Sequence, residues 1–241
     1  MRSPRARRRL SRAHITSHSA WLRPCAAGTS GVTMLHIVPH PWTEIDWAAP
    51  RPGARELRRS RDAVQFIPAS VGSPAVLRVV DQFRSMLANG GALAAAFTVQ
   101  DADDTAQWFL SRNRFEEYGF IRCLLTAPAL AETLPELYAN GPLADSLDFR
   151  DASALGLDGS IASVLTWGGA YVQFVGSGAD AKRMGQDFSD EIIGDRYDEF
   201  RLHISGVPWC PWFFDIAWDH TWIITDLRDQ RVLLLCITDT D

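Results

Sequence analysis

GVPWCPWFFDIAWDHTWIITD, residues 206–226, holds four of the chain's nine tryptophans, three aspartates, one cysteine and one histidine. Side chains on a β-strand alternate between two faces. A strand over residues 212–218 would put bulky apolar side chains on one face and acids on the other. The apolar face would carry Trp212, Phe214, Ile216 and Trp218. The other face would carry the acids Asp215 and Asp219 together with Phe213 and Ala217. The pattern predicts a half-buried antiparallel strand with its indoles inside and its carboxylates in water.

The sequence around this stretch predicts an antiparallel C-terminal half. We expect a three-strand meander over residues 212–218, 221–226 and 231–238, with turns between the strands. A further strand is predicted at 199–206 and an amphipathic helix at 179–195. Two strand-like runs around Gly168 and Gly169 predict a hairpin over 160–176.

The N-terminal half is predicted to alternate helices with short strands. Residues 36–59 are rich in proline and are expected to be extended, pinned to the body by Trp42 and Trp47. Helices are predicted from Ser73 to about 88, from Asp103 or Asp104 to Gly119, and over 127–139; strands are predicted over 92–99 and 120–126. The sequence therefore predicts an α+β fold, an antiparallel sheet with flanking helices. We expect a single domain over 34–241, with a possible sub-boundary near 142–160.

Residues 1–33 differ sharply in composition from the rest of the chain. They carry seven arginines and no acid, and no apolar run long enough for a secretory signal. We interpret them as a disordered or mis-annotated extension, with Met34 as the first residue of the domain. A transit peptide and a nucleic-acid-binding arm are the alternatives. Removing seven of the 24 basic residues leaves 17 against 29 acidic ones, so residues 34–241 have a net charge of −12.

This charge favours a basic protein partner and disfavours nucleic acid and anionic membranes. No run approaches the roughly 18 apolar residues of a membrane span. Lys182 is the only lysine, which suggests a GC-rich bacterial genome, and the cysteines form no paired motif. We therefore expect a bacterial, cytoplasmic protein with free thiols.

Five residues are candidates for catalysis, namely Asp215, Asp219, His220, His203 and Cys210. They could form a carboxylate–histidine hydrolase site or a Cys–His–Asp constellation. On one strand Asp215 and Asp219 would lie roughly 13 Å apart, too far to share a metal ion. His36 and His40 have metal-ligand spacing only on a helix, which Pro39 disfavours. No metal site is expected.

A dinucleotide-loop pattern, G-x-G-x-x-A, occurs at Gly176, Gly178 and Ala181, after a predicted strand and before a predicted helix. Asp180 would place negative charge where a phosphate should bind, and the downstream acids lie at the start of the next strand instead of at its end. No P-loop, H-E-x-x-H or G-x-S-x-G motif is present. We expect no cofactor.

Three function classes remain. An acidic, tryptophan-rich α+β body resembles bacterial toxin-immunity proteins in general character. The first hypothesis is therefore a non-enzymatic binding protein of the immunity or antitoxin type, which masks a basic partner. The alternatives are a small hydrolase that uses the region Asp215–His220, and a small-ligand sensor with a pocket lined by Trp167, Trp209 and Trp212.

Overall fold

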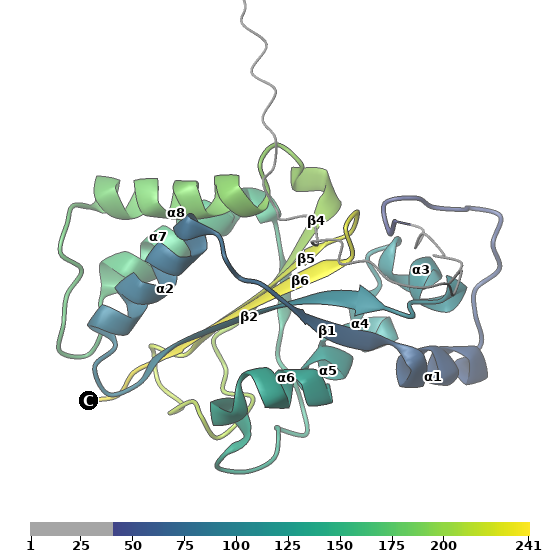
Figure 1. Cartoon of the computed structure of the whole chain (residues 1–241), viewed down its shortest axis with the longest axis horizontal. Coiled ribbons are helices and arrows are strands. Elements are labelled where there is room, and N and C mark those ends of the chain that lie inside the picture. The colour runs from purple at the N-terminus through teal and green to yellow at the C-terminus, as the bar shows by residue number, and fades with distance from the viewer. Residues whose placement is uncertain (1–40) are drawn as a thin grey trace, which may run out of the picture. The chain divides into compact units, whose positions relative to one another are not determined.

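The computed structural model describes residues 41–241, which contain a six-stranded antiparallel sheet with strand order β1-β2-β6-β5-β4-β3 (Figure 1). This confirms the predicted α+β class. The strands are β1 (Gln65–Ala69), β2 (Gly91–Gln100), β3 (Arg150–Ala152), β4 (Phe200–Ser205), β5 (His220–Asp226) and β6 (Arg231–Thr238). Residues 1–40, which include the predicted extension 1–33 with Cys25 and also His36 and His40, lie outside the described residues.

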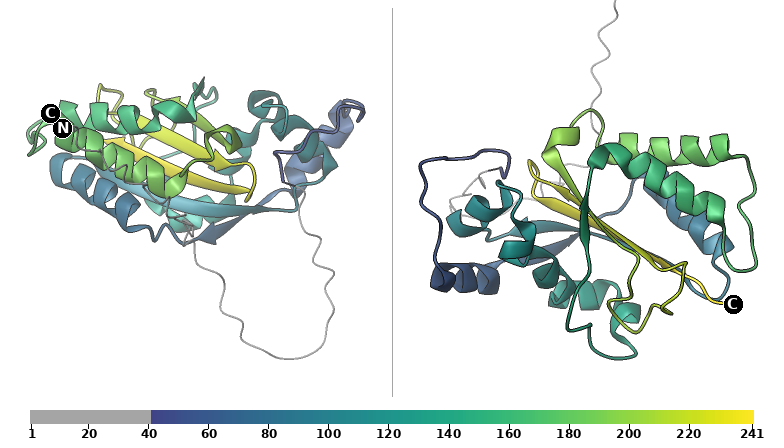
Figure 2. Two further views of the ribbon diagram at one scale, coloured as in Figure 1. Left: turned by 90° about the horizontal axis from the view of Figure 1, so that it is seen from above. Right: turned by 180° about the vertical axis from the view of Figure 1, so that it is seen from behind.

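Helices cover both faces of the sheet, as Figures 1 and 2 show. On one face lie α2 (Pro74–Met86), α7 (Leu157–Trp167) and α8 (Gly178–Ile192). The other helices are α1 (Ala54–Ala63), α3 (Asp104–Leu110), α4 (Phe115–Tyr118), α5 (Phe120–Leu125) and α6 (Pro128–Thr133), with 3₁₀ turns at Pro135–Tyr138, Ala154–Gly156 and Tyr197–Glu199.

The central strands β5 and β6 are buried on both faces because a helical layer lies on each side. Alternate residues of β5 therefore enter two separate cores. Trp222 stacks on Phe83 of α2, whereas Ile223 joins the cluster that includes Phe97 and Leu124. Side chains on the two faces of the sheet therefore contact different sets of residues.

Several predicted elements are confirmed together with their end signals. Helix α2 begins after Ser73, whose hydroxyl accepts from the backbone N–H of Val76. Helix α3 begins after Asp103, whose carboxylate accepts from two backbone N–H groups. The single helix predicted up to Gly119 is interrupted, however, because Asn113 has a left-handed φ of 55° and α4 begins only at Phe115. Strands β2, β4, β5 and β6 lie where the apolar runs predict them. These elements share a strong apolar pattern and a recognisable end.

The predicted strand over 212–218 is wrong, because this segment is a compact loop. Asp215 has a left-handed φ of 61°, and the Asp219 carboxylate accepts from the backbone N–H groups of residues 214–216. Asp219 is 1% exposed, while Phe214 is 48% exposed. The predicted arrangement of indoles inside and acids outside therefore fails here. The meander instead consists of β4, β5 and β6.

Two further predicted strand segments are helical. The expected hairpin over 160–176 is helix α7 followed by a loop, and Gly168 ends the helix instead of forming a hairpin turn. Leu157, Ile161 and Leu165 share its buried face at intervals of four residues. The predicted strand over 120–126 is helix α5. In both segments helical spacing and strand-like composition coincide.

The N-terminal segment also differs from the prediction. Residues predicted to be extended up to 59 include the first part of α1, and strand β1 was not predicted at all. Trp42 is buried, and its backbone N–H donates to the carbonyl of Leu227, whereas Trp47 is 80% exposed. Trp42 is the buried anchor of the segment, while the exposed Trp47 ring contacts the body through Arg112, whose guanidinium carbon lies 5.6 Å from the ring centroid.

Candidate functional site

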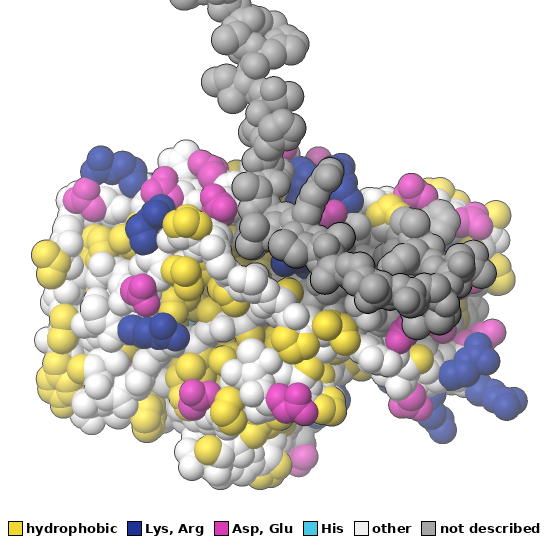
Figure 3. Space-filling model, in the orientation of Figure 1, with side chains coloured by type: hydrophobic (Ala, Val, Ile, Leu, Met, Phe, Trp, Pro, Cys, Tyr) yellow, Lys and Arg dark blue, Asp and Glu magenta, His cyan; other side chains and the backbone are white. Residues whose placement is uncertain are grey.

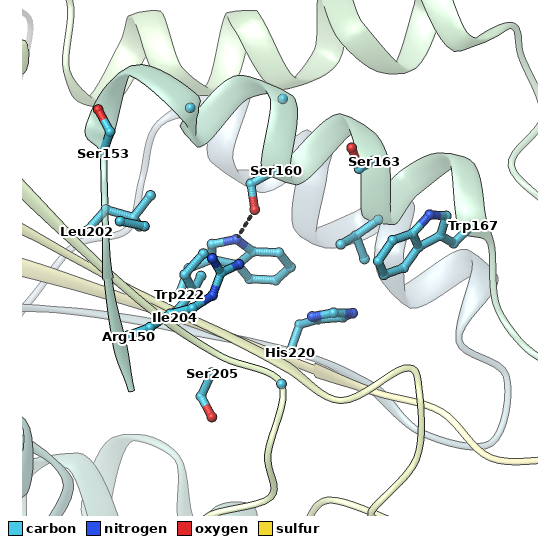
Figure 4. Close-up of a pocket in the computed structure, with 15 residues that line it drawn as sticks. Arg150, Ser153, Ser160, Ser163, Trp167, Leu202, Ile204, Ser205, His220 and Trp222 are labelled. Carbon is cyan, nitrogen blue, oxygen red and sulfur yellow. Dashed lines mark hydrogen bonds between the residues drawn. The ribbon is translucent and has the colours of Figure 1, made fainter. Parts of the chain in front are cut away.

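A pocket of about 600 Å³ lies between helix α7 and strands β3, β4 and β5; we name it the helix-side pocket (Figure 4). Its polar lining consists of Arg150, Ser153, Ser160, Ser163, Ser205 and His220. Its apolar lining consists of Ala152, Val164, Trp167, Leu202, Ile204 and Trp222. The volume is in the usual range for pockets that bind small molecules.

Helix and strand periodicities together place these side chains. Ser160, Ser163 and Trp167 lie at intervals of three and four residues, so they share one face of α7. On the sheet, Arg150 pairs with Ile204, and Ile204 pairs with Trp222 across the next ladder. Side chains that are directly opposite in an antiparallel ladder lie on the same face. The pocket is therefore formed by one helix face and one sheet face.

Three aromatic rings run from the pocket floor to its edge. The ring centroid of His220 lies 5.6 Å from that of Trp222 and 5.5 Å from that of Trp167. Trp222 is 1% exposed, and its Nε1–H donates to Ser160 Oγ at 2.9 Å, as Figure 4 shows. Trp167 is 58% exposed and forms the solvent-facing edge. A flat ligand can therefore stack on Trp167 and the partly exposed His220 from the open side, with Trp222 as the buried floor.

The electrostatics of this pocket contrast with those of the acidic body. Arg150 is the only charged side chain that residues 41–241 place in the lining, and within that range it makes no hydrogen bond or ion pair. Burial lowers the pKa of His220, and the Asp219 carboxylate and a hydrogen bond with the Ala217 backbone oppose the shift. His220 is therefore neutral at pH 7, and Arg150 sets the sign of the pocket's charge.

The lining holds hydroxyl groups but no assembled nucleophile. His220 Nε2 is buried and has no hydrogen-bond partner among the described residues. Ser160 Oγ accepts from Trp222, and Ser205 Oγ donates to the carbonyl of Val207. A serine nucleophile would need a hydrogen bond to its base. The part of the chain that the structure describes places no lining serine in such contact with His220.

The structure disperses the predicted catalytic residues. Asp219 Oδ1 accepts from Thr238 Oγ1 at 2.5 Å in addition to its backbone donors, so this carboxylate holds the loop together. Asp215 is exposed on the same loop. His203 pairs with Ile223 on β5, which places it on the sheet face opposite His220. Burial raises the pKa of the Cys210 thiol to about 11, so it is protonated at neutral pH.

Of the three tryptophans predicted to line a ligand pocket, Trp167 alone does so. Trp209 Nε1–H donates to Thr221 Oγ1 on the opposite sheet face, and Trp212 packs on Phe213 there. The sequence interpretation missed Arg150, Ser160 and Ser163, and it assigned Trp222 only to the core. The helical spacing from 160 to 167 could have revealed the two serines, but that segment was predicted to be a strand.

The dinucleotide-loop pattern lacks the structure that it needs. Gly176 lies in a loop and no strand precedes it, while Gly178 and Ala181 belong to α8. The Asp180 carboxylate accepts from the backbone N–H and the hydroxyl of Ser177 and so occupies the helix N-terminus. A pyrophosphate would bind at this same position. No group of three or more metal-ligating side chains occurs in the described range, 41–241.

Comparison with protein-family models, with curated proteins and with solved structures finds no significant match for this chain. Among residues 41–241, no helix combines the length and the apolar character that a membrane span requires.

Proposed function

We propose that the protein binds a small organic anion with a flat apolar part in the helix-side pocket. One observation carries this proposal: residues 34–241 have a net charge of −12, yet the described residues place Arg150 and no carboxylate in the lining of this pocket. A carboxylate or phosphate would pair with the Arg150 guanidinium, which is well suited to such groups. The flat part would lie against His220 and Trp167.

Binding, and not catalysis, is the activity that we propose. The described residues give His220 no nucleophile to activate, and its neutral imidazole suits a hydrogen bond to the ligand. Ser163 is exposed in the lining and would offer a hydroxyl group to the polar end of the ligand. These features together favour a small-ligand sensor or carrier over a hydrolase.

Isothermal titration with aromatic carboxylates tests this proposal, with 2-naphthoate and its neutral amide as a matched pair. The acid should bind saturably and the amide at least tenfold more weakly, because the amide cannot pair with Arg150. Arg150→Gln should lose this preference, while Arg183→Gln on the surface of α8 should keep it. Equal binding of acid and amide, an unchanged Arg150→Gln variant, or no binding across the panel would contradict the proposal.

The helix edge of the pocket gives a second readout. Trp167→Ala should weaken binding of 2-naphthoate by about three- to tenfold, the usual worth of one aromatic pair. Trp47→Ala is a matched control, because Trp47 is also exposed and lies outside the pocket lining. An equal effect of both substitutions would show that the ligand does not stack on Trp167.

A second candidate function is that of a bacterial, cytoplasmic binding protein of the immunity type that masks a basic partner and binds no nucleic acid. The charge of −12 favours it. The free thiols of Cys123, Cys210 and Cys236 suit the cytoplasm. On the face that Figure 3 shows, acids are interspersed with basic and apolar side chains and form no single patch. Co-purification of a stoichiometric basic protein that salt releases would support this function, and an acidic partner would contradict it.

A further inference from the structure

A second pocket, of about 330 Å³, lies against strands β3 and β4; we name it the opposite-face pocket. The ladder pairs Asp151 of β3 with His203 of β4, and both line this pocket. Their neighbours Arg150 and Ile204 line the helix-side pocket. Because strand residues alternate between faces, the two pockets open on opposite sides of the same strand pair.

Two carboxylates in this lining lack a cationic partner among the described residues. Asp151 accepts a hydrogen bond from Asn113 Nδ2 at 3.0 Å, and Glu116 makes no ion pair. Arg122 also lines the pocket, but its guanidinium donates to the backbone carbonyls of Ala144 and Asp145. The carboxylates are therefore available to a ligand that brings its own positive charge.

A buried histidine borders these carboxylates. His203 is 6% exposed, lines the pocket, and its Nδ1 has no hydrogen-bond partner among residues 41–241. Burial lowers its pKa, and Arg201 adds to this shift while Asp151 opposes it. A neutral imidazole does not repel a cation, and it keeps a nitrogen lone pair that can accept a hydrogen bond.

Aromatic rings complete the lining. Phe115 and Phe149 line the pocket, and the centroid of the Phe115 ring lies 5.0 Å from that of His203. Planar cations bind well on the faces of such rings. A compact ammonium or hydrated metal ion would use the rings less well than a flat guanidinium does. The described residues also include no cluster of three metal-ligating side chains.

We propose that the opposite-face pocket binds a guanidinium group, which pairs with Asp151 and Glu116 and lies against Phe149, the partly buried ring of the lining. The group can belong to a small molecule or to an arginine side chain of a protein partner. This second site is independent of the anion site in the helix-side pocket. If the source is a protein, the pocket is where the basic partner of the second candidate function would place an arginine.

Calorimetric titration with two probes, agmatine and an acetylated, amidated Gly-Arg-Gly peptide, tests the proposal. Peptides with citrulline or lysine in place of arginine are the matched ligands. The arginine peptide should bind at least tenfold more tightly than the citrulline peptide and several-fold more tightly than the lysine peptide. Similar affinity for agmatine and the arginine peptide would identify a free guanidinium as sufficient; binding of the peptide alone would identify a protein partner as the source.

Asp151→Asn and Glu116→Gln should each weaken arginine-peptide binding at least tenfold, whereas Asp190→Asn, an exposed acid of α8, should leave it unchanged. Asp151→Asn should also leave 2-naphthoate binding unchanged, and Arg150→Gln should leave peptide binding unchanged. The experiment therefore distinguishes a failure of the guanidinium site from a failure of the anion site. Equal binding of the citrulline peptide, full binding by Asp151→Asn, or displacement of the peptide by millimolar Mg²⁺ would overturn the guanidinium assignment.

Discussion

The helix-side and opposite-face pockets share one pair of strands but have opposite chemistry. Arg150 and Asp151 are consecutive residues of β3, and they bring a positive and a negative side chain to opposite faces of the sheet. Each pocket also contains a histidine with one nitrogen that lacks a partner among the described residues, His220 in one and His203 in the other. A three-residue edge strand can thus present two ligand-binding chemistries, because its side-chain period is two.

The two pockets differ in the burial of one large aromatic ring in each lining. The floor of the helix-side pocket is Trp222, which is almost fully buried and stacks on Phe83. The wall of the opposite-face pocket includes Phe149, which is only partly buried. Trp222 should therefore contribute more to the stability of the fold than Phe149 does, although Phe115 and His203 of the opposite-face pocket are also buried.

The largest expected effect follows from this difference. Trp222→Ala should lower the free energy of unfolding by about 3–5 kcal/mol, because it removes a buried ring and leaves a cavity. Phe149→Ala should cost only about 1 kcal/mol, because less of its ring leaves water on folding. Urea denaturation at pH 7 measures both. Equal costs would show that the two rings contribute equally to the core.

An intermediate effect concerns the feature that the pockets share. Burial holds the pKa values of His203 and His220 below the ordinary value of 6.5. As pH falls below about 6.5, the unfolded chain binds protons that the folded protein does not. The free energy of unfolding should therefore fall as pH decreases from 7 toward the lowered pKa values, by at most about 1.4 kcal/mol per pH unit for each histidine.

Single substitutions separate the two contributions to this pH dependence. His203→Gln and His220→Gln should each reduce the slope of unfolding free energy against pH, and the double variant should reduce it further. Denaturation curves at several pH values between 5 and 7 give the slopes, whatever the stability of each variant at pH 7. A variant whose slope matches that of the unsubstituted protein would show that its histidine has the same pKa in the folded and unfolded states.

The smallest expected effect concerns the charges that distinguish the pockets. Arg150 and Asp151 are both exposed, so Arg150→Gln and Asp151→Asn should change the free energy of unfolding by no more than about 0.5 kcal/mol. Each should nevertheless abolish the ligand preference of its own pocket. Urea denaturation at pH 7 provides the stability values. A loss of several kcal/mol in either variant would assign that charge to folding instead of to binding.

Sequence patterns predicted the elements whose ends and periodicity agree. Ser73 and Asp103 cap the helices that follow them, and the apolar runs at 220–226 and 231–238 form central strands. Prediction failed where one local pattern suits two structures. Residues 157–167 have strand-like composition and also helical spacing, and packing on the sheet and α8 selects the helix.

The loop before β5 shows a different reason for failure. Alternating residues at 212–218 satisfied a strand pattern, but the Asp219 carboxylate accepts hydrogen bonds from backbone N–H groups of that segment and from Thr238 of β6, the strand that pairs with β5. A buried carboxylate that accepts several hydrogen bonds can outweigh a local preference for extended backbone. The alternating pattern of residues 212–218 contains no information about the hydrogen bond between Asp219 and Thr238.

The sequence by itself determined the α+β class, the acidic body and the strongest helices and strands, because these depend on composition and on patterns within a few residues. Only the tertiary structure decided the two pockets. Arg150 and Asp151 acquire their opposite roles when β3 pairs with β4, which sets Asp151 opposite His203 and places Arg150 in the pocket that His220 also lines. Strand pairing joins segments that are far apart in the chain, and the register of that pairing determines which face each side chain enters.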